Sequence, residues 1–272
     1  MRILVSGSHG FVGSALTSFL QAKGHVVVPL VRYKQEGAVC WDPANGKLQL
    51  EDFEGFDAVI HLAGESIASG RWTKKKKEKI FQSRARDTWL LSQVLLRLCR
   101  PPKTLICASA IGFYGNRPGE ILSEESPLGR GFLASVCKKW EEATTSIENR
   151  GTRVVHTRFG VILDPKGGIL KKMNKFPVMF GDKNQILSWI VLEDVVGAIY
   201  HCLIHEQISG PVNFTSPYPI VQQELIKTPF RIPSCIVKLL LGQMGEEVLL
   251  SSACVYPEKL LRTGYIFRHP IL

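Results

Sequence analysis

Three regularly spaced glycines near the N-terminus constrain this chain more than any other feature. Gly7, Gly10 and Gly13 lie between the apolar run 3–5 and an amphipathic stretch over residues 11–21. In such a strand–turn–helix context the first glycine permits a tight turn and the second lets backbone N–H groups approach a pyrophosphate. The third allows the helix to pack closely on the strand. The pattern predicts the first unit of a doubly wound parallel sheet that binds a dinucleotide; a tight turn without a ligand is the alternative.

Strand-like and helix-like stretches continue to alternate after this turn. We expect strands at 26–28, 58–63, 105–108 and 154–159, and helices at 75–98 and 132–147. Strands that alternate with helices of this length predict an α/β Rossmann fold, a doubly wound parallel sheet with helices on both faces.

The alternation suggests two regions. Residues 1–165 are expected to form an NAD(P)-binding Rossmann domain, to which later strands up to about residue 215 contribute. Over residues 166–272, Pro and Gly punctuate shorter elements, with expected helices at 193–205 and 232–242 and an expected strand at 212–214. We expect this stretch to form a smaller substrate lobe over the carboxyl edge of the sheet, where open α/β sheets bind ligands.

Composition and cysteine usage exclude several classes of protein. A hydrophobic fraction of 45% and a charged fraction of 21% are typical of a globular chain. No apolar run approaches the ~20 residues of a membrane span, and residues 1–7 are interrupted by glycine too soon for a signal peptide. The seven cysteines are scattered and form no CxxC pair, so we expect a cytoplasmic protein without a disulfide framework or a metal site.

The net charge of +10 favours anionic ligands. Its densest part is the lysine run 74–77, but lysines at the start of a helix point in all directions, and no aromatic array accompanies them. We therefore expect a small-molecule substrate, with no nucleic-acid or membrane partner. The oligomeric state stays open.

The end of the second strand predicts which cofactor binds. NAD sites usually place Asp or Glu there for the ribose 2′-hydroxyl, whereas an arginine accommodates a 2′-phosphate. Here the strand ends at Val31-Arg32, and no acidic residue appears before Glu36. NADP (as NADPH when reduced) is therefore the expected cofactor; an ordinary solvated surface arginine is the alternative.

Further motifs make the chain resemble the extended, atypical short-chain dehydrogenases/reductases. More narrowly, it resembles epimerase-family proteins related to nucleotide-sugar epimerases. The matching motifs are His61–Glu65, Ser109–Gly115, Phe132–Ala134, Arg158–Leu163, Ser188–Ile190 and Gly264–Phe267. The resemblance implies a Rossmann fold, an NADP cofactor and oxidoreductase or epimerase chemistry on a small polar substrate such as a nucleotide sugar.

The glycine turn, the second strand end and the family resemblance together give a set of expected cofactor contacts. These are Gly7, Ser8, His9, Gly10, Phe11, Val12, Gly13, Val31, Arg32, Leu62, Ala63, Gly64, Arg84 and Ile162. Arg84 stands where extended members carry an asparagine near the cofactor, and its guanidinium could hold a phosphate or carboxylate.

The chain departs from the family at the proton relay. Ordinary members carry Tyr-x-x-x-Lys on one helix face, where the ammonium lowers the pKa of the phenol. Alignment on Glu141 puts Leu133 at the tyrosine position and Cys137, expected to be an inert buried thiol, at the lysine position. Ser109, near the family's substrate-orienting hydroxyl, and Tyr114, the nearest phenol, are the remaining catalytic candidates.

A second departure lies near the C-terminus. The helix expected to begin at residues 221–227 meets Pro229 after about two turns, so the lobe looks shortened relative to the family. Two functions therefore stay open. One is an NADP-dependent oxidoreductase or epimerase, and the other is an NADP-binding sensor or interaction module that has lost catalysis.

Overall fold

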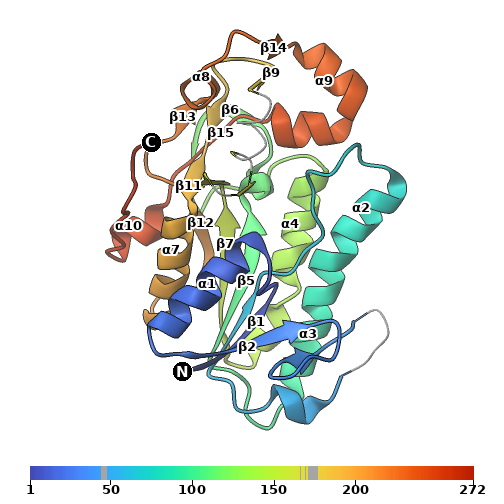
Figure 1. Ribbon diagram of the computed structural model, residues 1–272, viewed down its shortest axis with the longest axis vertical. Coiled ribbons are helices and arrows are strands. Elements are labelled where there is room, and N and C mark those ends of the chain that lie inside the picture. The colour runs from blue at the N-terminus through green and yellow to red at the C-terminus, as the bar shows by residue number, and fades with distance from the viewer. Residues whose placement is uncertain (44–47, 166, 169, 171–176) are drawn as a thin grey trace.

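A seven-stranded parallel sheet with helices on both faces forms the centre of the fold (Figure 1). The computed structural model describes residues 1–43, 48–165, 167–168, 170 and 177–272. The strands, in the order in which they lie side by side, are β12 (Gly210–Phe214), β7 (Arg153–Phe159), β5 (Thr104–Ala110), β4 (Ala58–His61), β1 (Arg2–Ser6), β2 (Val26–Val31) and β3 (Val39–Cys40). The strand order reverses between β1 and β4. The prediction of a Rossmann-type doubly wound sheet is confirmed.

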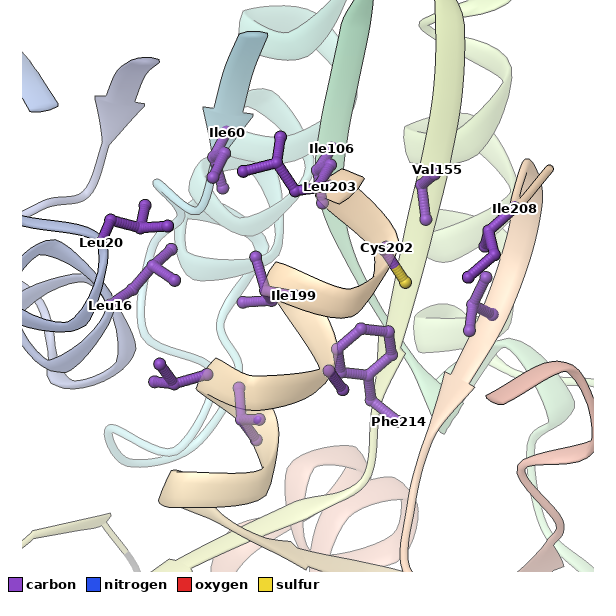
Figure 2. Close-up of a cluster of buried hydrophobic side chains, with 14 of the residues drawn as sticks. Leu16, Leu20, Ile60, Ile106, Val155, Ile199, Cys202, Leu203, Ile208 and Phe214 are labelled. Atoms are coloured by element: carbon purple, nitrogen blue, oxygen red, sulfur yellow. The ribbon is translucent and has the colours of Figure 1, made fainter. Parts of the chain in front are cut away.

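The two sides of each strand pack against different helices. Ile3 and Val5 of β1 face a core shared with α1 (Phe11–Ala22) and α7 (Leu192–Ile204), part of which Figure 2 shows. Leu4 faces the opposite core, which contains residues of α3 (Asp87–Leu96). Because successive side chains of a strand point to opposite faces, the continuous apolar runs follow from burial of both faces.

The two long expected helices are both interrupted. The helix expected at 75–98 consists of α2 (Lys74–Phe81), a π-helical turn over Gln82–Arg86, and α3. The helix expected at 132–147 splits into α4 (Phe132–Glu142) and α5 (Thr145–Asn149). At the second break the Thr144 hydroxyl donates to the Glu141 carbonyl, the kind of side-chain bond that competes with continuous helix.

The remaining elements, most of them in the later part of the chain, are short. They are η1 (Leu50–Phe53), η3 (Ile111–Tyr114), the strand pairs β8 (Val161–Asp164) with β11 (Trp189–Val191), β9 (Met179–Phe180) with β14 (Arg231–Ile232), β10 (Ile186–Leu187) with β13 (Ile220–Val221) and β6 (Arg117–Leu122) with β15 (Ala253–Val255), a π-helical turn over Gly245–Leu249, and the helices α8 (Gln222–Leu225), α9 (Ser234–Leu241) and α10 (Glu258–Arg262).

Two helix predictions in this part are corrected. The helix expected at 232–242 begins only at Ser234, because Ile232 still pairs with β9 and, as the residue before Pro233, is disfavoured in the helical conformation. At 221–227 the helix α8 ends after four residues, since Ile226 is already extended. The division at 165/166 remains a prediction, and residue 166 lies outside the described residues.

Candidate functional site

The glycine turn joins β1 to α1 as a closely packed backbone loop. Gly7 has a φ of +69°, which favours glycine, and its carbonyl accepts a hydrogen bond from the Gly10 N–H at 2.8 Å. A Cβ at Gly13 would lie 2.0 Å from that same carbonyl oxygen, so no side chain fits there. The first turn of α1 has neither a side-chain cap nor an acidic residue. Its N–H groups are therefore suited to an anion.

The other expected contacts near the turn lie around its outer side. Ser8 is buried and His9 is exposed, with Ser8 Oγ 3.3 Å from His9 Nδ1. Val12 and Ile162 pack against the core that β1 shares with α1 and α7. The Phe11 ring lies against residues 167–168, since a Cβ at Gly167 would come within 2.3 Å of it. The fold thus brings β8 and residues 167–168 to the glycine turn.

A pocket at the carboxyl ends of β1, β2 and β4 gathers several expected contacts with residues that the sequence did not indicate. Val31, Arg32, Ala63 and Gly64 were expected there. The pocket is also lined by Ser6, Leu30, Trp41, Pro43, His61, Ser83 and Asp87. Ser6, Leu30 and His61 lie at the ends of β1, β2 and β4, and only that position could have suggested them. Trp41 and Pro43 follow β3, Ser83 lies in the π turn and Asp87 begins α3. Leu62 is not among the lining residues and packs against the core with α1 and α7.

His61 presents an unused hydrogen-bonding nitrogen in this pocket. The Ser6 hydroxyl oxygen accepts from the backbone N–H groups of Leu62 and Ala63, so its own proton is directed to His61 Nδ1 at 2.7 Å. Burial lowers the pKa of His61 to about 4, which keeps the ring neutral with its proton on Nε2. Among the described residues Nε2 has no hydrogen-bond partner. His61 is therefore a buried donor beside the pocket.

Arg84 leaves the π turn and lies against the segment after β4. Its Nη1 donates to the Glu65 carbonyl at 2.8 Å, while the Ser83 hydroxyl accepts from the Glu65 N–H at 3.0 Å. The guanidinium carbon lies 5.1 Å from the Trp140 ring centroid. A Cβ at Gly64 would meet that carbon at 3.4 Å. The absence of a side chain at Gly64 thus leaves room for the guanidinium.

The two positions of the missing relay lie on one face of α4 and contain no proton donor for use near neutral pH. A Cβ at Gly112 would lie 3.2 Å from Leu133 Cβ and 3.8 Å from Cys137 Sγ, so both side chains face Gly112. Burial, reinforced by the nearby Glu141 carboxylate, raises the pKa of the Cys137 thiol to about 12. A thiol with that pKa is neither a nucleophile nor an acid of catalytic strength near neutral pH.

Cys137→Ala is accordingly expected to leave cofactor affinity and any turnover within about two-fold of wild type, because a buried thiol acts mainly as a small hydrophobe. Iodoacetamide labelling followed by peptide mass spectrometry should modify Cys99 and Cys235, which are exposed, and spare Cys137 in the folded protein. Rapid alkylation of Cys137, or loss of activity in the folded variant, would contradict this interpretation.

The two expected catalytic residues, Ser109 and Tyr114, are both buried and engaged within the protein. Ser109 is 2% exposed and donates to Glu141 at 2.7 Å. Arg158 holds the same carboxylate through two hydrogen bonds, from Nε at 2.9 Å and from Nη2 at 2.8 Å. It also donates to the Tyr114 hydroxyl at 2.8 Å. Ser109, Tyr114, Glu141 and Arg158 thus form one network, the Glu141–Arg158 network, in which the two hydroxyls that catalysis would need are already hydrogen-bonded.

The Tyr114 hydroxyl is bonded to two side chains within the protein. It donates to Asn213 Oδ1 at 2.6 Å, the side chain is fully buried, and burial raises the pKa of the phenol to about 12. Both side chains are thus engaged within the protein, and a catalytic role for Ser109 or Tyr114 stays a prediction. Ala110, the partly exposed neighbour of Ser109 on the opposite face of β5, carries no polar side chain.

Residues 243–247 hold the N-terminal end of α4. The Glu247 carboxylate accepts from the backbone N–H groups of Phe132 and Leu133 at 2.8 and 2.7 Å. Gln243 donates to this carboxylate and accepts from Lys77 of α2. A Cβ at Gly131 would lie 2.9 Å from the carboxyl carbon of Glu247, so the contact is close. Residues 243–247 are thus fixed beside Leu133 by a carboxylate that satisfies free N–H groups of the helix.

Within residues 1–43, 48–165, 167–168, 170 and 177–272, no group of three or more His, Cys, Asp or Glu side chains is arranged to hold a metal ion. No helix in the same part of the chain has the length and apolar character needed to cross a bilayer.

Comparison with known proteins agrees with the fold and the glycine turn. A model described as the NAD dependent epimerase/dehydratase family matches residues 3–135, and one described as a domain of unknown function matches residues 232–272. Epimerase family protein Mb2239 of Mycobacterium bovis is 36% identical over 98% of this chain and 93% of its own length.

Two solved structures are also similar over the whole chain. The human epimerase family protein SDR39U1 with NADPH has a TM-score of 0.89 at 28% identity, covering 100% of this chain and 96% of that one. The nucleoside-diphosphate sugar epimerase from Corynebacterium glutamicum has a TM-score of 0.84 at 36% identity, covering 100% of this chain and 56% of that one.

Proposed function

Because the chain belongs to the NAD-dependent epimerase/dehydratase family, we propose that it binds NADP(H) across the carboxyl ends of β2, β1 and β4 and does so without a working proton relay. The observation that carries the proposal is the combination of a complete glycine turn and an Arg32-lined pocket with apolar side chains at both relay positions. The human relative crystallised with NADPH supports the choice of cofactor.

The residues at the site fit such a dinucleotide. The N–H groups at the start of α1 would hold the pyrophosphate, and the exposed Arg32 would pair with the 2′-phosphate. His61 would donate from Nε2 to an acceptor atom of the bound dinucleotide. When bound, NADPH supplies a hydride. No side chain at Leu133 or Cys137 delivers the accompanying proton, so general acid–base assistance of ~10²–10⁴-fold is forfeited.

Arg32→Ala is expected to remove most of the preference for NADPH over NADH. Charge-assisted hydrogen bonds to the 2′-phosphate contribute about 1.5–3 kcal/mol, so the wild type should bind NADPH about ten-fold or more tighter than NADH. Calorimetric titration of both cofactors would measure this, with Lys34→Ala, an exposed cation two residues on, as the control. Equal wild-type affinities would show that Arg32 is an ordinary surface residue.

Oxidoreductase or epimerase activity on a small polar substrate is the second candidate function. The relative named as a nucleoside-diphosphate sugar epimerase favours it, since it is 36% identical to this chain. Purified protein would be incubated with NADPH and a panel of carbonyl compounds and nucleotide sugars, and cofactor oxidation and sugar products would be followed. Tight cofactor binding without turnover of any substrate would support a non-catalytic NADP(H)-binding protein. Turnover of a substrate would support an oxidoreductase or epimerase.

The proposal takes a small molecule as the ligand, with neither nucleic acid nor membrane as a partner. Two of the four lysines in the run 74–77 are occupied within the protein, because Lys76 pairs with Glu65 at 2.6 Å and Lys77 donates to Gln243. All seven cysteines are free thiols, which fits the reducing cytoplasm that we propose as the compartment.

A further inference from the structure

Arg84 is a largely buried cation without an acidic partner of its own. Its hydrogen-bond acceptors are the carbonyls of Glu65 and Ile80 and the Ser83 hydroxyl, and none of these carries a charge. In the part of the chain that the structure describes, Arg84 forms no ion pair. The carboxylate of Glu65, which does act on it electrostatically, is itself paired with Lys76. A full positive charge therefore remains at this point, because a guanidinium stays protonated.

This charge lies beside α4, the helix that carries Cys137 at the position aligned with the family's lysine. The guanidinium and the Cys137 sulfur are close enough to affect each other's pKa, and Cys137 stands at the lysine position of the relay. The Trp140 ring on the same helix packs against the guanidinium. Arg84 thus comes from a different helix but brings a cation to the neighbourhood of α4 in which the family keeps an ammonium.

The π turn explains how Arg84 reaches this position. A π-helical turn inserts an extra residue into an α-helix and is frequently found at functional sites. Over Gln82–Arg86 it turns Ser83 and Arg84 together toward Glu65, where each makes a hydrogen bond to the backbone. Arg86, two residues on, points to solvent. The geometry therefore selects Arg84 and not the neighbouring arginine.

The fold also indicates which end of the cofactor would meet this charge. A dinucleotide lies across the point where the strand order reverses, here between β1 and β4. With Arg32 at the end of β2 on the adenosine side, the nicotinamide of a bound cofactor would lie on the β4 and β5 side. Gly64 follows β4, and a Cβ there would lie 3.4 Å from the carbon of the Arg84 guanidinium.

We propose that Arg84 makes this site selective for the reduced cofactor, so that NADPH binds much more tightly than NADP⁺. The inference rests on the proposed NADP(H) binding. The oxidised nicotinamide ring carries a positive charge and the reduced ring is neutral, while all other charges of the two cofactors are the same. A fixed cation in a poorly solvated position repels only the oxidised ring. Without the tyrosine relay, this charge serves to distinguish redox states instead of activating a phenol.

Calorimetric titration of the wild-type protein with NADPH and with NADP⁺ is the first test. We expect NADPH to bind roughly ten-fold or more tightly than NADP⁺. Arg84→Met should bring the ratio of the two dissociation constants close to one, mainly by strengthening NADP⁺ binding. Arg84→Lys, which keeps the charge, should retain most of the preference. Arg86→Met, which removes an exposed guanidinium from the same turn, should match the wild type.

Three outcomes would overturn the inference. Equal wild-type affinities would do so without any variant, so the test does not depend on the folding of Arg84→Met. An unchanged ratio in folded Arg84→Met, or a ratio lost equally in Arg86→Met, would assign the preference to another feature. Failure of the wild type to bind either form would instead overturn the proposed function, and this inference with it.

Discussion

Gly13→Val is expected to abolish NADPH binding and to lower the free energy of unfolding by ~3 kcal/mol or more. The reason is steric, because a Cβ at this position would lie 2.0 Å from the Gly7 carbonyl oxygen and 2.8 Å from Ser8 Cα. Either α1 must move away from β1 or the turn must change conformation. Urea unfolding and NADPH titration would measure the two effects, with Ser18→Val on the exposed face of α1 as the control.

A substitution at Gly10 distinguishes a role in ligand binding from a role in packing. A Cβ at Gly10 would meet only the Gly7 carbonyl oxygen, at 3.0 Å, so Gly10→Val should reduce cofactor affinity with a smaller loss of stability than Gly13→Val. Unchanged NADPH affinity in folded Gly10→Val would mean that the turn is structural and holds no phosphate.

Arg158→Met is expected to destabilise the protein by about 3–5 kcal/mol, because it leaves the Glu141 carboxylate buried without its cation. The side chains of Arg158 and Glu141 are only 3% and 12% exposed, and the ion pair is 2.8 Å long. The double variant Arg158→Met, Glu141→Leu should be more stable than Arg158→Met alone, since it removes the unpaired charge. Urea unfolding of the wild type, Arg158→Met and the double variant would measure the three free energies of unfolding.

A surface ion pair provides the comparison. Lys139 pairs with Glu142 at 2.8 Å, but their side chains are 58% and 45% exposed. Lys139→Met should therefore change the free energy of unfolding by less than about 1 kcal/mol. A similarly small effect of Arg158→Met would contradict the view that the Glu141–Arg158 network holds β7 and α4 together.

The missing relay shows how far spacing alone could lead. Residues four apart on a helix share a face, so the alignment on Glu141 was enough to place Leu133 and Cys137 side by side. The structure agrees, since both side chains face Gly112. Spacing could not reveal that Ser109 and Tyr114 are buried. Ser109 contacts a residue 32 positions away and Tyr114 one 99 positions away, and neither contact leaves a local pattern.

The sequence by itself determined the doubly wound sheet, the glycine turn and the shared helix face of Leu133 and Cys137. Each depends on local rules: glycine where backbone must approach backbone, apolar runs where both faces of a strand are buried, and a helical period of 3.6 residues. The tertiary structure decided what the polar side chains do. His61 carries its proton on Nε2, which has no partner among the described residues, because the Ser6 hydroxyl accepts from the chain after β4 and donates to Nδ1. Arg84 meets Gly64 because a π turn redirects it. Such roles depend on contacts between segments distant in sequence, which only folding brings together.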